Sequence, residues 1–386
     1  MTHKILVVDD EPDLQLLVKQ NFRSQIRSQV YEFVFATNGR EALDRLEEHA
    51  DVALVMSDIN MPVMDGLTLL RHIGEMDRPL KSIVVSAYGD TKNVRVAMNR
   101  GAFDFVTKPI DFDDLEITLS KTLKEVETLR EALSARDQLV AVRQELSIGQ
   151  QIQTSFLPET LPQPEGWEIA AAFRPAREVA GDFYDAFELD GDRVGFVIAD
   201  VCDKGVGAAL FMALIRSLIR AFSEIEDGPN GISVSPIQRT NDYLLRNHWK
   251  ANMFATMFFG TLHPKENTIV YMNGGHNPPI HFDRNGVKHP LKPSAPAVGM
   301  FPNVVFNPTE ISIEPGEFVF MFTDGVPEAK NVEGGFFSEE HLESLLEAPV
   351  SSAQELCDRM MAALDSHIGT AKQYDDITIL AIRRLP

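Results

Sequence analysis

Acidic, hydroxyl and basic residues follow the apolar runs near the start of the chain. Asp9 and Asp10 follow the first run, Asp58 the third, Ser86 the fourth and Lys108 the fifth. Three converging carboxylates repel one another unless a hard cation such as Mg²⁺ lies between them. A lysine and a hydroxyl can neutralise and hydrogen-bond a phosphoryl group. This set predicts a site that forms an acyl phosphate on an aspartate.

Five short apolar runs must position those residues. They alternate with segments of helical length, which indicates a parallel sheet covered by helices on both faces. The runs are residues 5–8, 33–35, 54–56, 83–85 and 103–106. Ligands of such sheets bind beyond the carboxyl ends of the strands, where the five residues would lie. We predict an α/β doubly wound, five-stranded parallel domain over residues 1–120.

Four motifs in this region resemble those of the receiver domain of two-component response regulators, in order, spacing and strand position. They are ILVVDDEP, MSDINMPVMDG, VVSAYGD and GAFDFVTKP. The resemblance implies that Asp58 accepts phosphate from a cognate histidine kinase. It also implies that Asp9, Asp10 and Asp58 hold Mg²⁺.

The same resemblance implies a receiver switch formed by Ser86, Phe105 and Lys108, with Ser86 and Phe105 as the switching pair. Phe105 lacks the hydroxyl of a tyrosine. That difference removes a hydrogen bond from the switch and leaves its rotamer change intact. The peptide bond between Lys108 and Pro109 is expected to be cis.

Residues 117–155 have the pattern of one long helix. Charged residues separate apolar ones spaced three and four apart, and no glycine or proline occurs before Gly149. The narrow apolar stripe is typical of a two-stranded coiled coil, and it then shifts in phase. Its members are Leu115, Leu119, Val126, Leu129 and Leu133, followed by Leu139, Val142 and Leu146. We predict a coiled-coil linker over residues 121–155 and a homodimer; packing of the helix against its own domains is the alternative.

Aspartates recur beside apolar runs in residues 156–386, most of them next to glycine or other small residues. They include Asp182, Asp200, Asp324 and Asp375. Small neighbours let the backbone turn sharply, so that a carbonyl can face a ligand. Oxygen ligands without Cys or paired His favour Mg²⁺ or Mn²⁺ over zinc. Four carboxylates offset two divalent cations, and such a pair can activate water and clamp the oxygens of a displacement at phosphorus.

This third region begins after a proline-rich segment that cannot continue a helix. Strands are predicted at residues 193–199, 254–262, 268–273, 318–322 and 377–382, with a helix over 208–222. Most strands end in short turns, which favours antiparallel sheets. We predict an α+β layered domain over residues 156–386.

Seven motifs between residues 146 and 386 resemble those of PPM-type serine/threonine phosphatases, in the bacterial SpoIIE and RsbU-like branch. They are LSIGQQIQTSFLP, PAREVAGDFYD, ADVCDKGVGAALFMA, NMFATMFFGTL, NGGHNPP, FMFTDGVPEA and DDITIL. The resemblance implies that Asp182, Asp200, Asp324 and Asp375 are the catalytic metal ligands, with Asp200 bridging the two metals and the Val201 carbonyl completing the ligand set of the second metal. It further implies direct attack of metal-activated water on phosphoserine or phosphothreonine. The implied substrate is a phosphorylated anti-sigma-factor antagonist of the STAS type.

Five other polar residues have two interpretations each. His276 is either a general acid or a structural hydrogen-bonding group. Arg177 either steers the phosphate or makes a surface salt bridge. Asp185, Asp203 and Asp376 either orient metal-bound waters or are solvated turn residues.

Composition excludes several classes of protein. Thirty-six Lys and Arg against fifty-seven Asp and Glu give a net charge of −21 with no basic patch, which disfavours nucleic acid as a partner. Two cysteines cannot form a disulfide framework. No stretch of about 18 apolar residues is expected to span a membrane, and the start lacks a signal-peptide core. We expect a cytoplasmic protein without membrane insertion.

Together these observations predict a response regulator in which phosphorylation of Asp58 controls a metal-dependent protein phosphatase. The alternative is an adaptor or scaffold, gated by Asp58, whose phosphatase-like domain is not catalytic. The four intact carboxylates favour catalysis. A transcription factor would need a basic helix-turn-helix, and the acidic third region offers none.

Overall fold

The computed structural model describes residues 2–87, 89–225, 235–284 and 286–386. The chain forms two compact units, residues 1–142 and 143–386. Each unit has its own buried cores.

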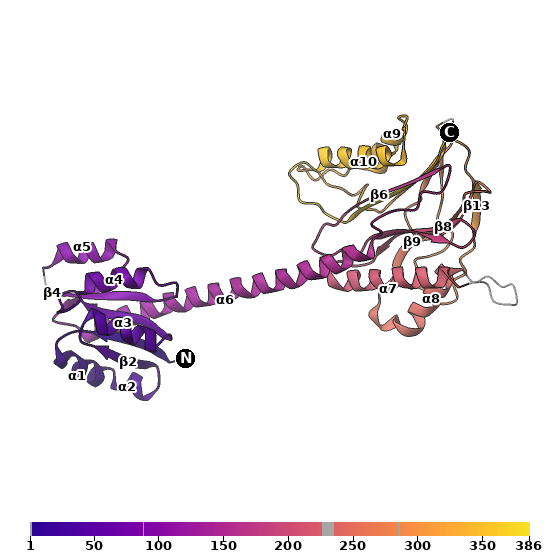
Figure 1. Cartoon of the computed structure of the whole chain (residues 1–386). Helices are drawn as coiled ribbons and strands as arrows, with labels where there is room; N and C mark the ends of the chain where they lie inside the picture. The colour runs from indigo at the N-terminus through magenta and orange to yellow at the C-terminus, as the bar shows by residue number, and fades with distance from the viewer. Residues whose placement is uncertain (1, 88, 226–234, 285) are drawn as a thin grey trace. The chain divides into compact units, whose positions relative to one another are not determined.

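The first unit is a five-stranded parallel sheet with strand order β2-β1-β3-β4-β5, as predicted. The strands are β1 (His3–Val8), β2 (Tyr31–Ala36), β3 (Val52–Asp58), β4 (Lys81–Ala87) and β5 (Asp104–Lys108). The connecting helices are α1 (Pro12–Asn21), α2 (Arg23–Arg27), α3 (Gly39–Glu48), α4 (Gly66–Gly74) and α5 (Thr91–Asn99) (Figure 1).

Both faces of this sheet are buried, which explains its continuous apolar runs. Along β1, Ile5 and Val7 join a core that includes Leu14 of α1. Leu6 and Val8 point the opposite way and join a core with residues of α3 and α4. Since side chains alternate along a strand, a strand covered on both sides needs apolar residues at every position.

The long helix α6 (Phe112–Phe156) begins five residues before the predicted start. Asp111 caps it, because its Oδ1 accepts hydrogen bonds from the backbone N–H groups of Asp113 and Asp114. Its first turns belong to the receiver core, in which Leu115 and Leu119 are buried.

The predicted coiled-coil stripe is therefore divided. Val126 is also buried in the receiver core, so this part of the stripe packs within its own unit, as the alternative interpretation held. Leu129, Leu133 and Leu139 are exposed. Only this later part is available for pairing with a second helix.

The second unit contains two five-stranded sheets in which every strand pairing is antiparallel, as predicted. One sheet has the order β13-β10-β9-β8-β7 and the other β12-β11-β14-β15-β6. The strands of the first are β7 (Phe183–Leu189), β8 (Arg193–Val201), β9 (Ala255–His263), β10 (Thr268–Gly274) and β13 (Thr309–Ser312). Those of the second are β6 (Trp167–Arg174), β11 (Ile280–Phe282), β12 (Lys288–Pro290), β14 (Phe318–Phe322) and β15 (Ile377–Arg384).

Helices cover the outer faces of this sandwich (Figure 1). One layer holds α7 (Val206–Ser223), α8 (Pro236–Asn247) and the short 3₁₀ helix η1 (Trp249–Ala251), and the other holds α9 (Glu339–Leu346) and α10 (Ala353–Ile368). In β8, Phe196 and Ile198 enter the core between the sheets. Val197 and Ala199 enter the core under α7. This alternation fixes which face of the sheet each side chain of β8 lies on.

The expectation that no stretch is long and apolar enough to span a membrane is wrong for α7. Its 18 residues reach a mean hydropathy of 1.6. The helix packs Phe211 and Ile215 into the core beneath it, and its Arg216 and Arg220 both pair with a buried carboxylate of β7. These contacts are those of a core helix.

Candidate functional site

The receiver carboxylates meet at the carboxyl ends of β1 and β3. Asp9, Asp10 and Asp58 can each place one oxygen so that all three oxygens lie within 4.8 Å of one another. Asp9 and Asp58 are buried, and Asp10 is exposed. Lys108 Nζ lies 2.6 Å from Asp58 Oδ2 and 3.1 Å from Asp9 Oδ2. An oxygen-only set of this kind, open on one side, fits Mg²⁺.

The electrostatics of this site depend on Lys108. Burial raises the pKa of Asp9, against the opposing effects of the Glu11 N–H and of Lys108. Burial acts to lower the pKa of Lys108, but hydrogen bonds to Asp58 and Asp9 outweigh it and raise that pKa. Lys108 therefore stays charged and is held against the carboxylate expected to accept phosphate.

The predicted switch residues lie on neighbouring strands. Ser86 is buried on β4, and among the described residues its Oγ has no hydrogen-bond partner. Such a buried hydroxyl is suited to donate to a phosphoryl oxygen on Asp58. Phe105 on β5 is 41% exposed. The cis peptide bond between Lys108 and Pro109 is confirmed.

The four aspartates of the second unit converge at one end of its sandwich. Asp182 directly precedes β7 and Asp200 lies near the end of β8, where these strands pair. Asp324 follows β14 and Asp375 precedes β15, which also pair. The two sheets are linked there by a 2.8 Å hydrogen bond from Thr378 Oγ1 to Asp182 Oδ2.

These carboxylates disfavour one another's charged forms. Burial and then the charge of Asp200 raise the pKa of Asp182 well above its usual value. Burial and then the charge of Asp324 raise the pKa of Asp200 to about 7. Burial and then the charge of Asp375 raise the pKa of Asp324 to about 6. A cluster of oxygen donors with this much mutual repulsion fits divalent cations.

The Val201 carbonyl lies beside this cluster. A Cβ at Gly181 would stand 2.9 Å from Val201 O, so only glycine lets the segment before Asp182 approach that carbonyl so closely. The Val201 carbonyl, which is the predicted backbone ligand, therefore lies next to the segment that carries the predicted carboxylate ligand Asp182.

Lys204 contacts the aspartate cluster, and the sequence argument did not single it out. Its Nζ lies 2.7 Å from Asp375 Oδ2 and 4.7 Å from the centre of the Tyr374 ring. It stands four residues after Asp200 in the motif ADVCDKG. A lysine four residues from a predicted metal ligand is a signal that could have been used, by analogy with Lys108 in the receiver.

Asp376 orients backbone next to the cluster rather than lying in a solvated turn. Its carboxylate accepts hydrogen bonds from the N–H groups of Ala176 at 2.7 Å and Gly181 at 3.0 Å. It thereby fixes the segment that leads to Asp182.

Neither interpretation of Asp185 was correct. Its side chain is fully buried and pairs with Arg216 at 2.8 Å and Arg220 at 2.7 Å. It holds α7 against β7. Asp203 is exposed and has a φ of 72°, in agreement with a solvated turn.

His276 has the contacts of a structural residue. It is buried, its Nδ1 lies 3.0 Å from Thr256 Oγ1, and its N–H donates to Asn273 Oδ1. Burial lowers the pKa of His276 to about 4, so the ring is neutral at pH 7.

Arg177 does not make the expected surface salt bridge with any described residue within 4.0 Å. It is exposed, and one guanidinium nitrogen lies 4.0 Å from the Cβ position of Gly205. Its charge is therefore available near the loop that carries Lys204.

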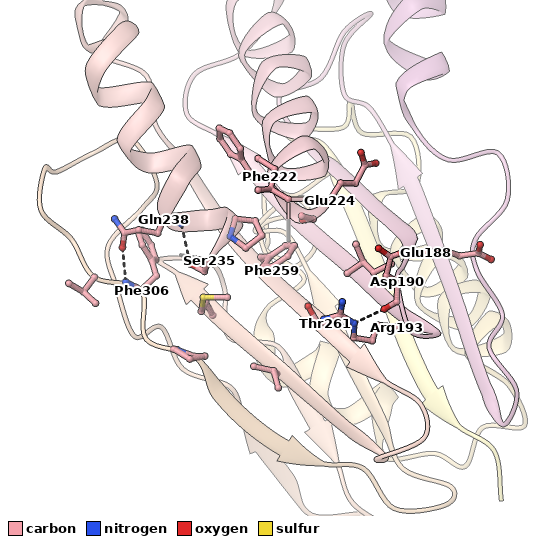
Figure 2. A pocket seen from close by; sticks show the side chains of 18 residues that line it. Glu188, Asp190, Arg193, Phe222, Glu224, Ser235, Gln238, Phe259, Thr261 and Phe306 are labelled. Atoms are coloured by element: carbon pink, nitrogen blue, oxygen red, sulfur yellow. Dashed lines mark hydrogen bonds between the residues drawn. The ribbon is translucent and has the colours of Figure 1, made fainter. Parts of the chain in front are cut away.

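A separate pocket of about 860 Å³ lies between the β7–β8 turn, the end of α7 and the start of α8 (Figure 2). Glu188, Asp190 and Glu224 line it together with Arg193, whose Nε donates to the Asp190 carbonyl. Asp182, Asp200, Asp324 and Asp375 do not contribute to its wall. This pocket is distinct from both carboxylate clusters.

A doubly wound domain with an aspartate cluster, joined to a two-sheet sandwich with a second cluster, is the arrangement of a receiver domain followed by a PP2C-type domain. The family model for Stage II sporulation protein E (SpoIIE) matches residues 190–385, and that for the response regulator receiver domain matches residues 5–120. The chain belongs to the SpoIIE family and carries a receiver domain before its SpoIIE domain. Asp182 precedes the matched range, so its place in the site rests on its contacts.

Relatives and solved structures agree with this assignment. The chain is 42% identical over 264 residues to Protein IcfG of Synechocystis, a match that covers 63% of this chain and 42% of IcfG. It is 27% identical over 245 residues to Phosphoserine phosphatase RsbU of Bacillus subtilis, covering 63% of this chain and 71% of RsbU. The SiaA-PP2C domain of Pseudomonas aeruginosa superposes with a TM-score of 0.54 at 21% identity over 64% of this chain and 98% of that one. This last likeness shows the fold of the second unit.

Proposed function

We propose that the protein is a metal-dependent phosphoserine phosphatase controlled by phosphorylation of Asp58. The observation that carries this proposal is the convergence of four carboxylates at one end of the sandwich, where burial and neighbouring charges raise the pKa of Asp182, Asp200 and Asp324. Such a cluster is unfavourable by itself and becomes favourable when it binds cations. The printed activity of RsbU, a phosphoserine phosphatase, supports the same chemistry.

In this proposal Asp182, Asp200, Asp324 and Asp375 hold two Mg²⁺ or Mn²⁺ ions, with the Val201 carbonyl as a further ligand. When bound, these ions would stabilise negative charge on the phosphoryl oxygens and lower the pKa of water at the site.

The chain's own residues orient that machinery. The Thr378 hydroxyl fixes Asp182, while Asp376 fixes the backbone before it. Lys204 and Arg177 place positive charge beside the cluster, where each attracts a substrate phosphate in an otherwise acidic protein. The neutral, buried His276 supports the loop and is not required to transfer a proton.

The receiver site is proposed to hold Mg²⁺ through Asp9, Asp10 and Asp58 and to take its phosphate from a cognate histidine kinase. Lys108 and Ser86 then contact the new phosphoryl group. The proposed organisation is a receiver over residues 1–120, a linker over 121–155 and a phosphatase domain over 156–386, in a cytoplasmic homodimer paired through the exposed part of α6.

The proposed substrate is a phosphorylated anti-sigma-factor antagonist with a STAS domain. This assignment rests on the likeness to RsbU. The chain spans 42% of IcfG and 71% of RsbU. Because these matches cover only part of each relative, the substrate and the partner of this chain are proposed here and need their own test.

The test is release of phosphate from a phosphoserine peptide and from a phosphorylated STAS protein in the presence of Mn²⁺. We expect Mn²⁺-dependent release by the wild type and none by Asp375→Ala. Mn²⁺ binding without hydrolysis of either substrate would contradict the proposal and favour the adaptor alternative.

A further inference from the structure

The last turns of α6 pack along the segment that leads to Asp182. Gly149 and Gln153 are four residues apart and so lie on one side of α6, and Leu157 directly follows the last residue of this helix. A Cβ at Gly149 would lie 3.7 Å from Val179 Cγ1. Leu157 enters the same buried core as Phe183.

Gln153, between them, forms a double hydrogen bond with a single backbone residue. Its Nε2 donates to the Ala180 carbonyl at 2.7 Å, and its Oε1 accepts from the Ala180 N–H at 2.9 Å. Gln153 is 8% exposed and Ala180 is fully buried. The amide thus replaces a neighbouring strand, because it pairs with both backbone groups of one residue. Without it, two buried polar groups would have no partner.

Ala180 lies two residues before Asp182, and the residue between them is held from the other side. The Gly181 N–H donates to Asp376 Oδ2 at 3.0 Å, and the Gly181 Cα lies against the Val201 carbonyl. The segment 180–182 is therefore held by the start of β15 on one side and by α6 on the other. Its position sets where the Asp182 carboxylate lies relative to the Val201 carbonyl.

We propose that Gln153 is a positioning residue through which α6 sets the geometry of the metal site. The same continuous helix contributes Leu115 and Leu119 to the receiver core. A rotation or shift of α6 changes the hydrogen bonds of Gln153, and these act directly on the backbone that carries Asp182. The inference rests on the proposed function, since it gives the phosphatase site its route of control.

The test compares Gln153→Leu with Gln151→Leu in the full-length chain. Leucine at position 153 keeps the apolar volume and removes both hydrogen bonds. Gln151 is an exposed residue of the same helix, and its side chain has no such hydrogen bond with any residue that the structure describes, so it controls for a changed helix surface. Gln153→Glu, which keeps the acceptor for the Ala180 N–H, provides a second, milder variant should Gln153→Leu unfold.

The first measurement is Mn²⁺ affinity, by calorimetric titration in an Asp10→Asn background that weakens the receiver site. Groups that orient metal ligands change metal affinity by roughly 10–100-fold, so we expect about a tenfold weaker affinity in Gln153→Leu and a smaller loss in Gln153→Glu. Gln151→Leu should match the parent. Equal affinities for the Leu variants at 151 and 153 would overturn the proposal.

The second measurement is the change in phosphatase rate when acetyl phosphate is added at saturating Mn²⁺, with Asp10 intact. We expect the wild type and Gln151→Leu to respond alike, Gln153→Leu to respond less, and KM for the peptide to stay unchanged. An undiminished response in Gln153→Leu would also overturn the proposal. Because Mn²⁺ binding is measured without substrate, a chain that binds Mn²⁺ but hydrolyses nothing would refute the proposed function and still test Gln153.

Discussion

The receiver and the SpoIIE domain both gather aspartates at strand ends, but they balance the charge differently. In the receiver, Lys108 Nζ lies within 3.1 Å of both buried carboxylates. In the SpoIIE domain, Asp375 is the one carboxylate of a described residue that pairs with Lys204 Nζ, and burial together with neighbouring charges raises the pKa of Asp182, Asp200 and Asp324. The first cluster has a cation of its own and suits a phosphoryl acceptor. The second has an excess of negative charge and suits a pair of metal ions.

The largest effect on the rate of phosphate release is expected from removing one carboxylate of the aspartate cluster in the SpoIIE domain. Asp324→Asn should lower the Mn²⁺-dependent rate of phosphate release by more than the roughly 10–100-fold typical of groups that only orient a ligand, because it removes a ligand and its charge. Steady-state kinetics over a Mn²⁺ series provide the measurement. Asp192→Asn, at an exposed turn carboxylate, should retain the wild-type rate. A wild-type rate in Asp324→Asn would contradict the proposal that the second cluster, unlike the receiver cluster, needs all its carboxylates to hold metal ions.

On the receiver side, Asp58→Asn should abolish incorporation of labelled phosphate from acetyl phosphate, because the acceptor oxygen is lost. The exposed Asp44→Asn variant should label like the wild type. Radiolabelling followed by denaturing electrophoresis measures this directly. Label that persists in Asp58→Asn would place the acceptor on another residue and remove the chemical role that distinguishes the first cluster.

A steric change next to the second cluster should have an intermediate effect. A Cβ at Gly325 would stand 1.7 Å from the carbonyl oxygen of Asp376, so the backbone of one segment would have to move. Gly325→Ala should therefore destabilise the SpoIIE domain by about 3 kcal/mol and impair Mn²⁺ binding. Gly207→Ala meets no atom within 4 Å and should leave the thermal midpoint unchanged or slightly raised. Equal thermal unfolding midpoints for the two variants would show that the close approach of Gly325 to the Asp376 carbonyl is not needed for stability.

The last prediction concerns the pH dependence of stability. The folded-state pKa of Asp200 is about 7 against a usual 3.8, so between about pH 4 and 7 the folded chain binds more protons than the unfolded chain at this position. Its contribution to stability is present below pH 4 and lost as pH rises towards 7, at up to about 1.4 kcal/mol per pKa unit.

In metal-free buffer, the unfolding midpoint of the wild type should therefore fall more steeply from pH 5 to pH 7.5 than that of Asp200→Asn. Added Mn²⁺ should reverse the difference at pH 7.5. Parallel curves for the two proteins would show that the charge of Asp200 is already balanced, as Lys108 balances the receiver cluster.

Much of this architecture could be predicted from the sequence, because apolar periodicity reports burial directly. The run at residues 318–322 coincides with β14, and the predicted helix over 208–222 corresponds to α7. The motif aspartates were also placed at strand ends, and the structure brings them together. Their roles as metal ligands stay predictions.

The remaining features depend on contacts between distant segments. Asp185 pairs with Arg216 and Arg220 of α7, a partnership that no local pattern reveals. The start of α6 was placed too late because Leu115 and Leu119 fit both a coiled-coil stripe and a receiver core. Periodicity shows which face of a helix is apolar, but not what covers that face.

The most direct test of the account is the ratio of phosphatase rates with and without acetyl phosphate, measured at saturating Mn²⁺ in the wild type and in Asp58→Asn. We predict a ratio different from one in the wild type and equal to one in Asp58→Asn. The same ratio in both proteins would contradict the claim that the receiver cluster controls the metal cluster.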